Sequence, residues 1–141
     1  MFKRRWMSWL TSAALFLCLA IGPSASAAED GNAPQTPFKI GDGLYYVGAS
    51  DIASYLIVTR GGLIVIDGGY ASTAPQILAN IRRLGFDPRQ VKILLNTHGH
   101  TDHAGGLAAL KAATGAKVYS SALDAPLLED GGRSDFALGA A

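Results

Sequence analysis

The spacing of apolar residues changes midway along the chain, and this change predicts the fold class. Between residues 38 and 71, short apolar runs alternate with glycine-containing turns, which is typical of β-strands joined by tight connections. The Arg-Gly-Gly sequence at 60–62 predicts a hairpin turn. Strands are predicted at 44–47, 54–59 and 63–66. This region therefore predicts an antiparallel β-meander.

From residue 72 onward, apolar residues recur at spacings of three and four, the period of a helix with one buried face. Ser72 or Thr73 can cap this helix, and Gly85 can end it. The later elements alternate in type: a strand at 91–95, a polar loop at 96–103, a helix ending at 114, a strand at 116–119 and a helix at 121–128. In the second helix, residues 107–110 are all expected to face inward. The whole pattern predicts an α/β fold in which strand-helix units follow the meander.

The first 27 residues are typical of a secretory signal peptide. Three basic residues near the start precede an apolar run at 13–21, and Ala-Ser-Ala at 25–27 fits a cleavage site. The apolar run is shorter than the ~20 residues that cross a bilayer, so no stable membrane anchor is expected. Residues 28–37 then predict a flexible leader and 38–141 one domain. The mature protein is expected to be periplasmic or secreted.

Removal of the signal segment changes the charge and the thiol content of the protein. The chain has 12 basic and 11 acidic residues, and three basic residues lie in the signal segment, so nine basic residues remain against 11 acidic ones. A mildly acidic mature protein argues against a nucleic-acid partner. The one cysteine, Cys18, lies in the same segment, so the mature protein would have no disulfide and no thiolate ligand.

All the histidines of the chain lie in one hexapeptide, His-Gly-His-Thr-Asp-His, at residues 98–103. It follows a predicted strand, and catalytic sites in α/β folds favour strand ends. His98 and His100 are two residues apart, so in an extended segment both imidazoles leave on the same side and can bind one ion. Asp102 and His103 diverge from this pair and can serve a second ion. Imidazole and carboxylate ligands without cysteine favour a catalytic zinc site.

A structural role for these residues is the alternative. Asp102 could cap a helix that starts near Ala104, because an aspartate there accepts from free backbone amides and suits the helix dipole. A single histidine, taken alone, is more often a surface or core residue than a ligand. Four such residues at this spacing, with no histidine elsewhere in the chain, favour the metal.

The hexapeptide resembles the His-x-His-x-Asp-His signature of the metallo-β-lactamase superfamily. The resemblance extends over about residues 38–128 and includes SYLIVT, LIVIDGG and GGLAALKAATGAKVYSS. It implies the αββα sandwich of that family, of which this chain would form the amino-terminal half. It also implies that His98 and His100 bind one zinc ion and that Asp102 and His103 bind a second.

The family also implies roles for two aspartates and a class of substrate. Asp102 would orient the attacking water, and Asp67, at a strand end, would lie behind the site and order its loop. His103 directly after Asp102, the lack of a mature cysteine and the export signal resemble subclass three of the metallo-β-lactamases. The implied activity of the intact protein is zinc-dependent hydrolysis of β-lactam antibiotics, which gives resistance without a serine nucleophile. Thioesterases and lactonases of the superfamily share the motif, so a thioester or a lactone is the alternative small-molecule substrate.

The family pattern needs two further histidines, one for each metal, and the three histidines present are already used. We therefore expect the chain to be an incomplete and inactive part of a longer enzyme, with a non-catalytic short product as the alternative. Half of a two-sheet sandwich leaves one sheet face without its partner layer. Such an exposed apolar face predicts aggregation or dimerisation.

Overall fold

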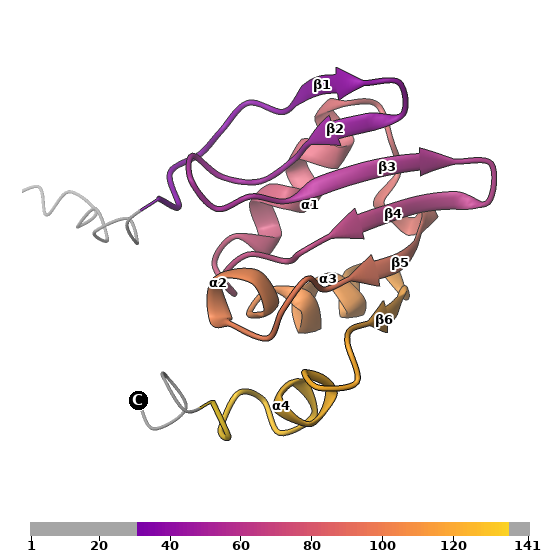
Figure 1. Cartoon of the computed structure of the whole chain (residues 1–141). Coiled ribbons are helices and arrows are strands. Elements are labelled where there is room, and N and C mark those ends of the chain that lie inside the picture. Colours follow the sequence, from indigo (N-terminus) through magenta and orange to yellow (C-terminus); the bar gives the residue numbers. More distant parts are fainter. Residues whose placement is uncertain (1–30, 136–141) are drawn as a thin grey trace, which may run out of the picture.

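The computed structural model describes residues 31–135, in which six strands form one sheet in the order β1-β2-β3-β4-β5-β6 (Figure 1). The strands are β1 (Phe38–Gly41), β2 (Leu44–Tyr46), β3 (Tyr55–Thr59), β4 (Gly62–Ile66), β5 (Val91–Leu95) and β6 (Lys117–Tyr119). The first four strands pair antiparallel, whereas β4–β5 and β5–β6 pair parallel. The predicted α/β fold, a meander followed by strand-helix units, is confirmed. Residues 1–30, with the predicted signal peptide, and 136–141 lie outside the described residues.

Strand β1 is an element that the apolar pattern did not predict. It pairs with β2 at the edge of the sheet, with Phe38 opposite Tyr46 and a register shift between Lys39 and Gly41. Its alternation of apolar and polar residues is too short to indicate a strand without its partner. The rings of Phe38 and Tyr46 stack with centroids 5.2 Å apart, a contact between strands that fixes the edge. The other three strands of the meander begin and end within one residue of their predicted bounds.

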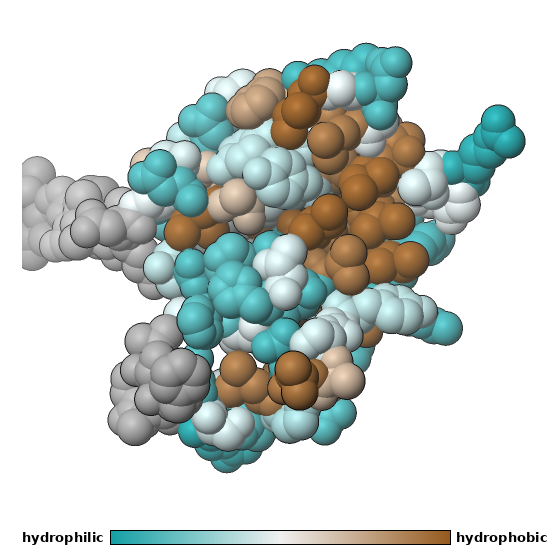
Figure 2. All heavy atoms as spheres, viewed as in Figure 1, coloured by the Kyte–Doolittle hydropathy of each residue, from teal (hydrophilic) through white to brown (hydrophobic). Residues whose placement is uncertain are grey.

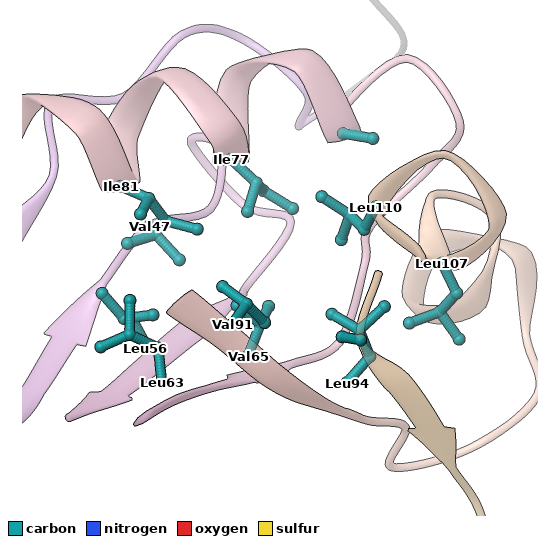
Figure 3. Close-up of a cluster of buried hydrophobic side chains, with 12 residues drawn as sticks. Val47, Leu56, Leu63, Val65, Ile77, Ile81, Val91, Leu94, Leu107 and Leu110 are labelled. Carbon is teal, nitrogen blue, oxygen red and sulfur yellow. The ribbon is translucent and has the colours of Figure 1, made fainter. Parts of the chain in front are cut away.

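Helices α1 (Ala74–Arg83) and α3 (Leu107–Thr114) cover one face of the sheet (Figure 1). Alternate strand residues point to them: Leu56, Val65 and Leu94 lie opposite one another on adjacent strands and are buried. The labelled core residues are Val47, Leu56, Leu63, Val65, Ile77, Ile81, Val91, Leu94, Leu107 and Leu110 (Figure 3). The core thus lies between the sheet and these two helices.

Several details of the helical half differ from the predictions. Thr73 is the N-cap of α1, but its hydroxyl donates to Asn32 Oδ1 at 2.6 Å and makes no cap bond. The predicted loop at 96–103 contains the start of the one-turn helix α2 (Thr101–Ala104), and the helix predicted at 121–128 begins only with α4 (Ala125–Glu129). A short 3-10 helix, η1 (Pro88–Gln90), precedes β5.

Helix α3 buries a narrower stripe than predicted. Leu107 and Leu110 are buried, but Ala108 and Ala109 are exposed, so the expectation for the two alanines was wrong. A helix that lies on one side of a sheet buries positions three and four apart, and the residues between them turn to solvent. None of the helices within residues 31–135 has the length and apolarity of a membrane span.

Residues 31–37 contain no helix or strand but hydrogen-bond to the rest of the domain. Gly31 O accepts from Ser50 Oγ and from the Asp51 amide, each at 2.8 Å. Asn32 Nδ2 donates to Ser72 Oγ at 2.9 Å. These bonds join the segment to the β2–β3 connection and to the start of α1.

The other face of the sheet is apolar and carries no helix within the described part of the chain. One side chain from each strand forms a row across it, in the order Phe38, Tyr46, Tyr55, Ile66, Leu95 and Tyr119. A second row contains Leu44, Ile57, Ile64 and Ile93. Figure 2 shows apolar side chains gathered on this side of the molecule. We call the surface formed by these two rows the open face.

Candidate metal centre

The hexapeptide lies where the carboxyl ends of β4 and β5 meet. These strands pair parallel, so Asp67, which follows β4, lies beside Asn96, which follows β5. The Asp67 amide continues the pairing by donating to Leu95 O at 2.9 Å. The chain then runs through residues 97–100 and enters α2. This is the end of a parallel sheet at which α/β proteins place their sites.

Three side chains of the hexapeptide bring one donor atom each into a common space. The donor atoms of His98, His100 and Asp102 all lie within 4.8 Å of one another, and the three residues are half-buried. The two imidazole centroids are 4.9 Å apart. Because two donors on one zinc ion lie at most about 4 Å apart, side-chain movements of under about 1 Å suffice to enclose an ion. The donor set fits zinc, which takes imidazole and carboxylate ligands.

His103, the fourth predicted ligand, lies against the other three. Its Nε2 is 3.4 Å from Asp102 Oδ2, and its ring centroid is 4.0 Å from that of His98. Asp102 thus shares a space with His98 and His100 and also contacts His103. The two predicted pairs form one continuous cluster, with Asp102 between them, that can hold one ion or two.

The local geometry does not support Asp102 as a helix cap. Helix α2 begins at Thr101, its N-cap is His100, and that cap has no side-chain hydrogen bond. Asp102 lies within the first turn, and its carboxylate contacts His103. The carboxylate thus faces the imidazoles of the hexapeptide and not the free amides at the start of the helix.

Asp67 is buried beside the cluster and hydrogen-bonds to it. Its Oδ2 accepts from Thr97 Oγ1 at 2.7 Å and lies 2.9 Å from His103 Nδ1. Its Oδ1 accepts from the Thr97 amide at 2.8 Å and from Asn96 Nδ2 at 3.4 Å. Among the non-glycine residues of 31–135, only Asp67 has a positive φ, of 60°. Aspartate tolerates this left-handed conformation better than most residues, and its four hydrogen bonds hold it there.

Glycines let the loop after β4 approach the start of α3. Gly68 N donates to His103 O at 2.7 Å, and Gly106 N donates to Gly69 O at 2.8 Å. A Cβ at Gly106 would lie 2.1 Å from Gly68 O, so a side chain does not fit. The Gly-Gly pair before α3 thus allows the start of that helix to pack closely against the loop that carries Asp67.

One wall of the site comes from residues that the sequence analysis did not select. A cavity of about 330 Å³ is lined by His98 and His100 from the loop and by residues of the α4 segment that include Asp124 and Leu127. A Cβ at Gly99 would lie 2.5 Å from Leu127 Cδ2, so glycine lets the α4 segment pack against the metal-binding loop. No sequence pattern marks Leu127, because it reaches the loop only through tertiary packing.

Comparison with known proteins finds one family and several solved structures that are similar to this chain. A family model described as the metallo-beta-lactamase superfamily matches residues 47–140. A class B3 di-zinc metallo-beta-lactamase from an Alaskan soil metagenome is 44% identical, with a TM-score of 0.77, over 82% of this chain and 44% of that chain. The native metallo-beta-lactamase from Legionella gormanii is 44% identical, with a TM-score of 0.73, over 75% of this chain and 40% of its own.

A curated relative carries a different name. Hydroxyacylglutathione hydrolase from Anaeromyxobacter dehalogenans is 38% identical over 94 residues, which are 64% of this chain and 34% of that protein. The chain therefore spans less than half the length of each of these three relatives.

Proposed function

Because the chain belongs to the metallo-beta-lactamase superfamily, we propose that the full-length protein is a zinc hydrolase that opens β-lactams. The observation that carries this proposal is the cluster of His98, His100 and Asp102 donor atoms at the carboxyl end of β5. The similarity to subclass B3 metallo-beta-lactamases supports a β-lactam as the substrate.

Each residue of the cluster would have a different role in the reaction. His98 and His100 would hold a first zinc ion, and Asp102 with His103 a second. Zinc bound there would supply hydroxide at neutral pH and polarise the scissile carbonyl. Asp102, which lies between the two groups of imidazoles, would accept a hydrogen bond from the attacking water and orient it. Asp67 would keep the loop and the His103 ring in place through its hydrogen bonds.

A thioester is the second candidate substrate, and a lactone of similar reactivity is a third. The name of the curated relative, hydroxyacylglutathione hydrolase, favours the thioester. The same metal cluster would serve the hydrolysis of all three substrates, because in each of them hydroxide attacks a carbonyl carbon. The β-lactam remains the first candidate, because the solved structures similar to this chain include subclass B3 metallo-beta-lactamases.

Hydrolysis by the purified full-length protein loaded with zinc tests the proposal. Nitrocefin and a carbapenem would be compared with a hydroxyacylglutathione thioester and a lactone. We expect β-lactam turnover that a chelator abolishes and added zinc restores. His100→Ala should lose this turnover, whereas Ala109→Ser, an exposed change on α3, should keep it. Turnover of the thioester without opening of any β-lactam would refute the β-lactam assignment.

We further propose that the protein is exported, on the basis of the signal segment at residues 1–27. Export would place a β-lactam hydrolase in the periplasm or outside the cell, where it would give resistance. Cell fractionation with amino-terminal sequencing tests this: the expected mature protein begins near Ala28, and an uncleaved cytoplasmic form would contradict it.

A further inference from the structure

We propose that Thr97 is a positioning residue that fixes which nitrogen of the His98 imidazole carries the proton. The inference rests on the proposed metal site and extends it to a residue outside the predicted ligand set. Thr97 lies between Asn96 and His98 in the loop that follows β5. Its hydroxyl links the buried carboxylate of Asp67 to the His98 ring.

The direction of each hydrogen bond follows from the protons available. Thr97 Oγ1 lies 2.7 Å from Asp67 Oδ2 and 3.2 Å from His98 Nδ1. A carboxylate only accepts, and a hydroxyl has one proton to donate, so the hydroxyl proton points to Asp67. The hydroxyl oxygen then accepts from His98, which places the proton of the neutral imidazole on Nδ1. The Nε2 atom of His98 keeps its lone pair, as a metal ligand requires.

Asp67 acts on His103 in the same way, without an intermediate group. His103 Nδ1 lies 2.9 Å from Asp67 Oδ2 and donates to it, which leaves the lone pair of the neutral ring on Nε2, the atom beside Asp102. One buried carboxylate therefore orients two imidazoles, His103 directly and His98 through Thr97. Thr97 is held for this purpose by its amide, which donates to Asp67 Oδ1 at 2.8 Å. Its β-branched side chain also restricts rotation about χ1.

The same contacts argue against Thr97 as a nucleophile. In nucleophilic catalysis, the histidine takes the proton of the attacking hydroxyl. Here His98 Nδ1 donates to the hydroxyl, and the hydroxyl proton is engaged by Asp67. Thr97 is thus arranged to orient a metal ligand.

The test uses the full-length, metal-free protein with ¹⁵N-labelled histidine, at a pH where the imidazoles are neutral. Thr97→Val keeps the shape of the side chain and removes the hydroxyl, whereas Thr97→Ser keeps the hydroxyl. NMR correlation spectra report the nitrogen that carries the proton, and competition with a chelator reports zinc affinity. The His103 ring is an internal control, because its bond to Asp67 does not pass through the Thr97 hydroxyl.

We expect Thr97→Val to shift the His98 proton from Nδ1 towards Nε2 and to lower zinc affinity about 10-fold, the effect typical of losing a partner of a metal ligand. His103 should keep its proton on Nδ1, and Thr97→Ser should match the wild type. Thr97→Val with an unchanged His98 proton or unchanged affinity would overturn the proposal. A change at His103 as well would show that Thr97 only holds the loop, and would also overturn it. If the wild type opens no β-lactam, the proposed function fails, but these two readouts still decide the role of Thr97.

Discussion

The two faces of the sheet are both apolar, yet only one of them is packed within residues 31–135. Leu94 and Leu95 are consecutive in β5: Leu94 is fully buried in the core, whereas Leu95 is 41% exposed on the open face. A sheet with one solvated face alternates apolar and polar residues, and strands that are apolar on both sides are typical of sheets covered on both faces. These strands therefore have the composition of a sheet that is covered on both faces, and the described residues cover only one of them.

The largest expected effect is on zinc binding and activity, which should be weak or absent in the polypeptide with one covered sheet face and only the hexapeptide ligands. We expect the mature polypeptide of residues 28–141 to bind zinc weakly and to leave nitrocefin intact, because its three histidines all lie in the hexapeptide. Chelator competition and nitrocefin absorbance measure the two properties, with the full-length protein as the control. Zinc-dependent turnover by the polypeptide would contradict this expectation.

The substitutions Leu94→Ala and Leu95→Ala compare how much each face of the sheet contributes to stability. Leu94→Ala opens a cavity in the core and should lower the free energy of unfolding by about 2–5 kcal/mol. Leu95→Ala removes a partly exposed side chain and should cost about 1 kcal/mol or less. Urea denaturation of the 141-residue polypeptide measures both. Equal losses would mean that the open face is covered in solution.

A second pair compares backbone contacts on the packed side with those at the sheet edge. In Gly106→Ala, the new Cβ meets the carbonyl oxygen of Gly68, and overpacking of this kind costs about 1–3 kcal/mol. At Gly41, a Cβ meets nothing within 4 Å, so Gly41→Ala should change stability by less than about 1 kcal/mol. Thermal unfolding of both variants checks the difference. An unchanged stability of Gly106→Ala would show that the start of α3 does not pack against the loop after β4 as described.

The smallest expected effect concerns association through the open face. We expect the mature polypeptide of residues 28–141 to self-associate as its concentration rises, since the open face is largely apolar. Ile64→Lys places a charge within this face and should weaken association severalfold. Ala109→Lys adds the same charge on the exposed side of α3 and should leave association unchanged. Sedimentation velocity measures both, and equal behaviour of the two variants would exclude the open face as the contact.

The sequence pattern predicted the parts of the fold that depend on local spacing. Strand β5 has the predicted bounds, and the hexapeptide lies at its end as expected. The pattern failed where packing between distant segments decides: β1 depends on pairing with β2, and Ala108 and Ala109 face solvent because the sheet touches only one stripe of α3.

The candidate site likewise contains residues that the sequence predicts and residues that only the fold brings to it. The four predicted ligands are recognisable because they are neighbours in sequence with the chemistry of metal donors. The hydroxyl of Thr97 and the side chain of Leu127 carry no such mark. Their contacts arise only when parallel pairing brings Asp67 beside the loop and when the α4 segment packs against Gly99.

The closeness of the ligands in sequence also bears on the order in which the centre assembles. His98, His100 and Asp102 span five residues, and closing so short a loop costs little conformational entropy. The contact between Asp67 and His103 joins residues 36 positions apart, and such distant contacts form slowly because β4 and β5 must first pair. The residues of the hexapeptide can therefore come together early in refolding, whereas the bond that holds His103 to Asp67 forms only after the two strands have paired.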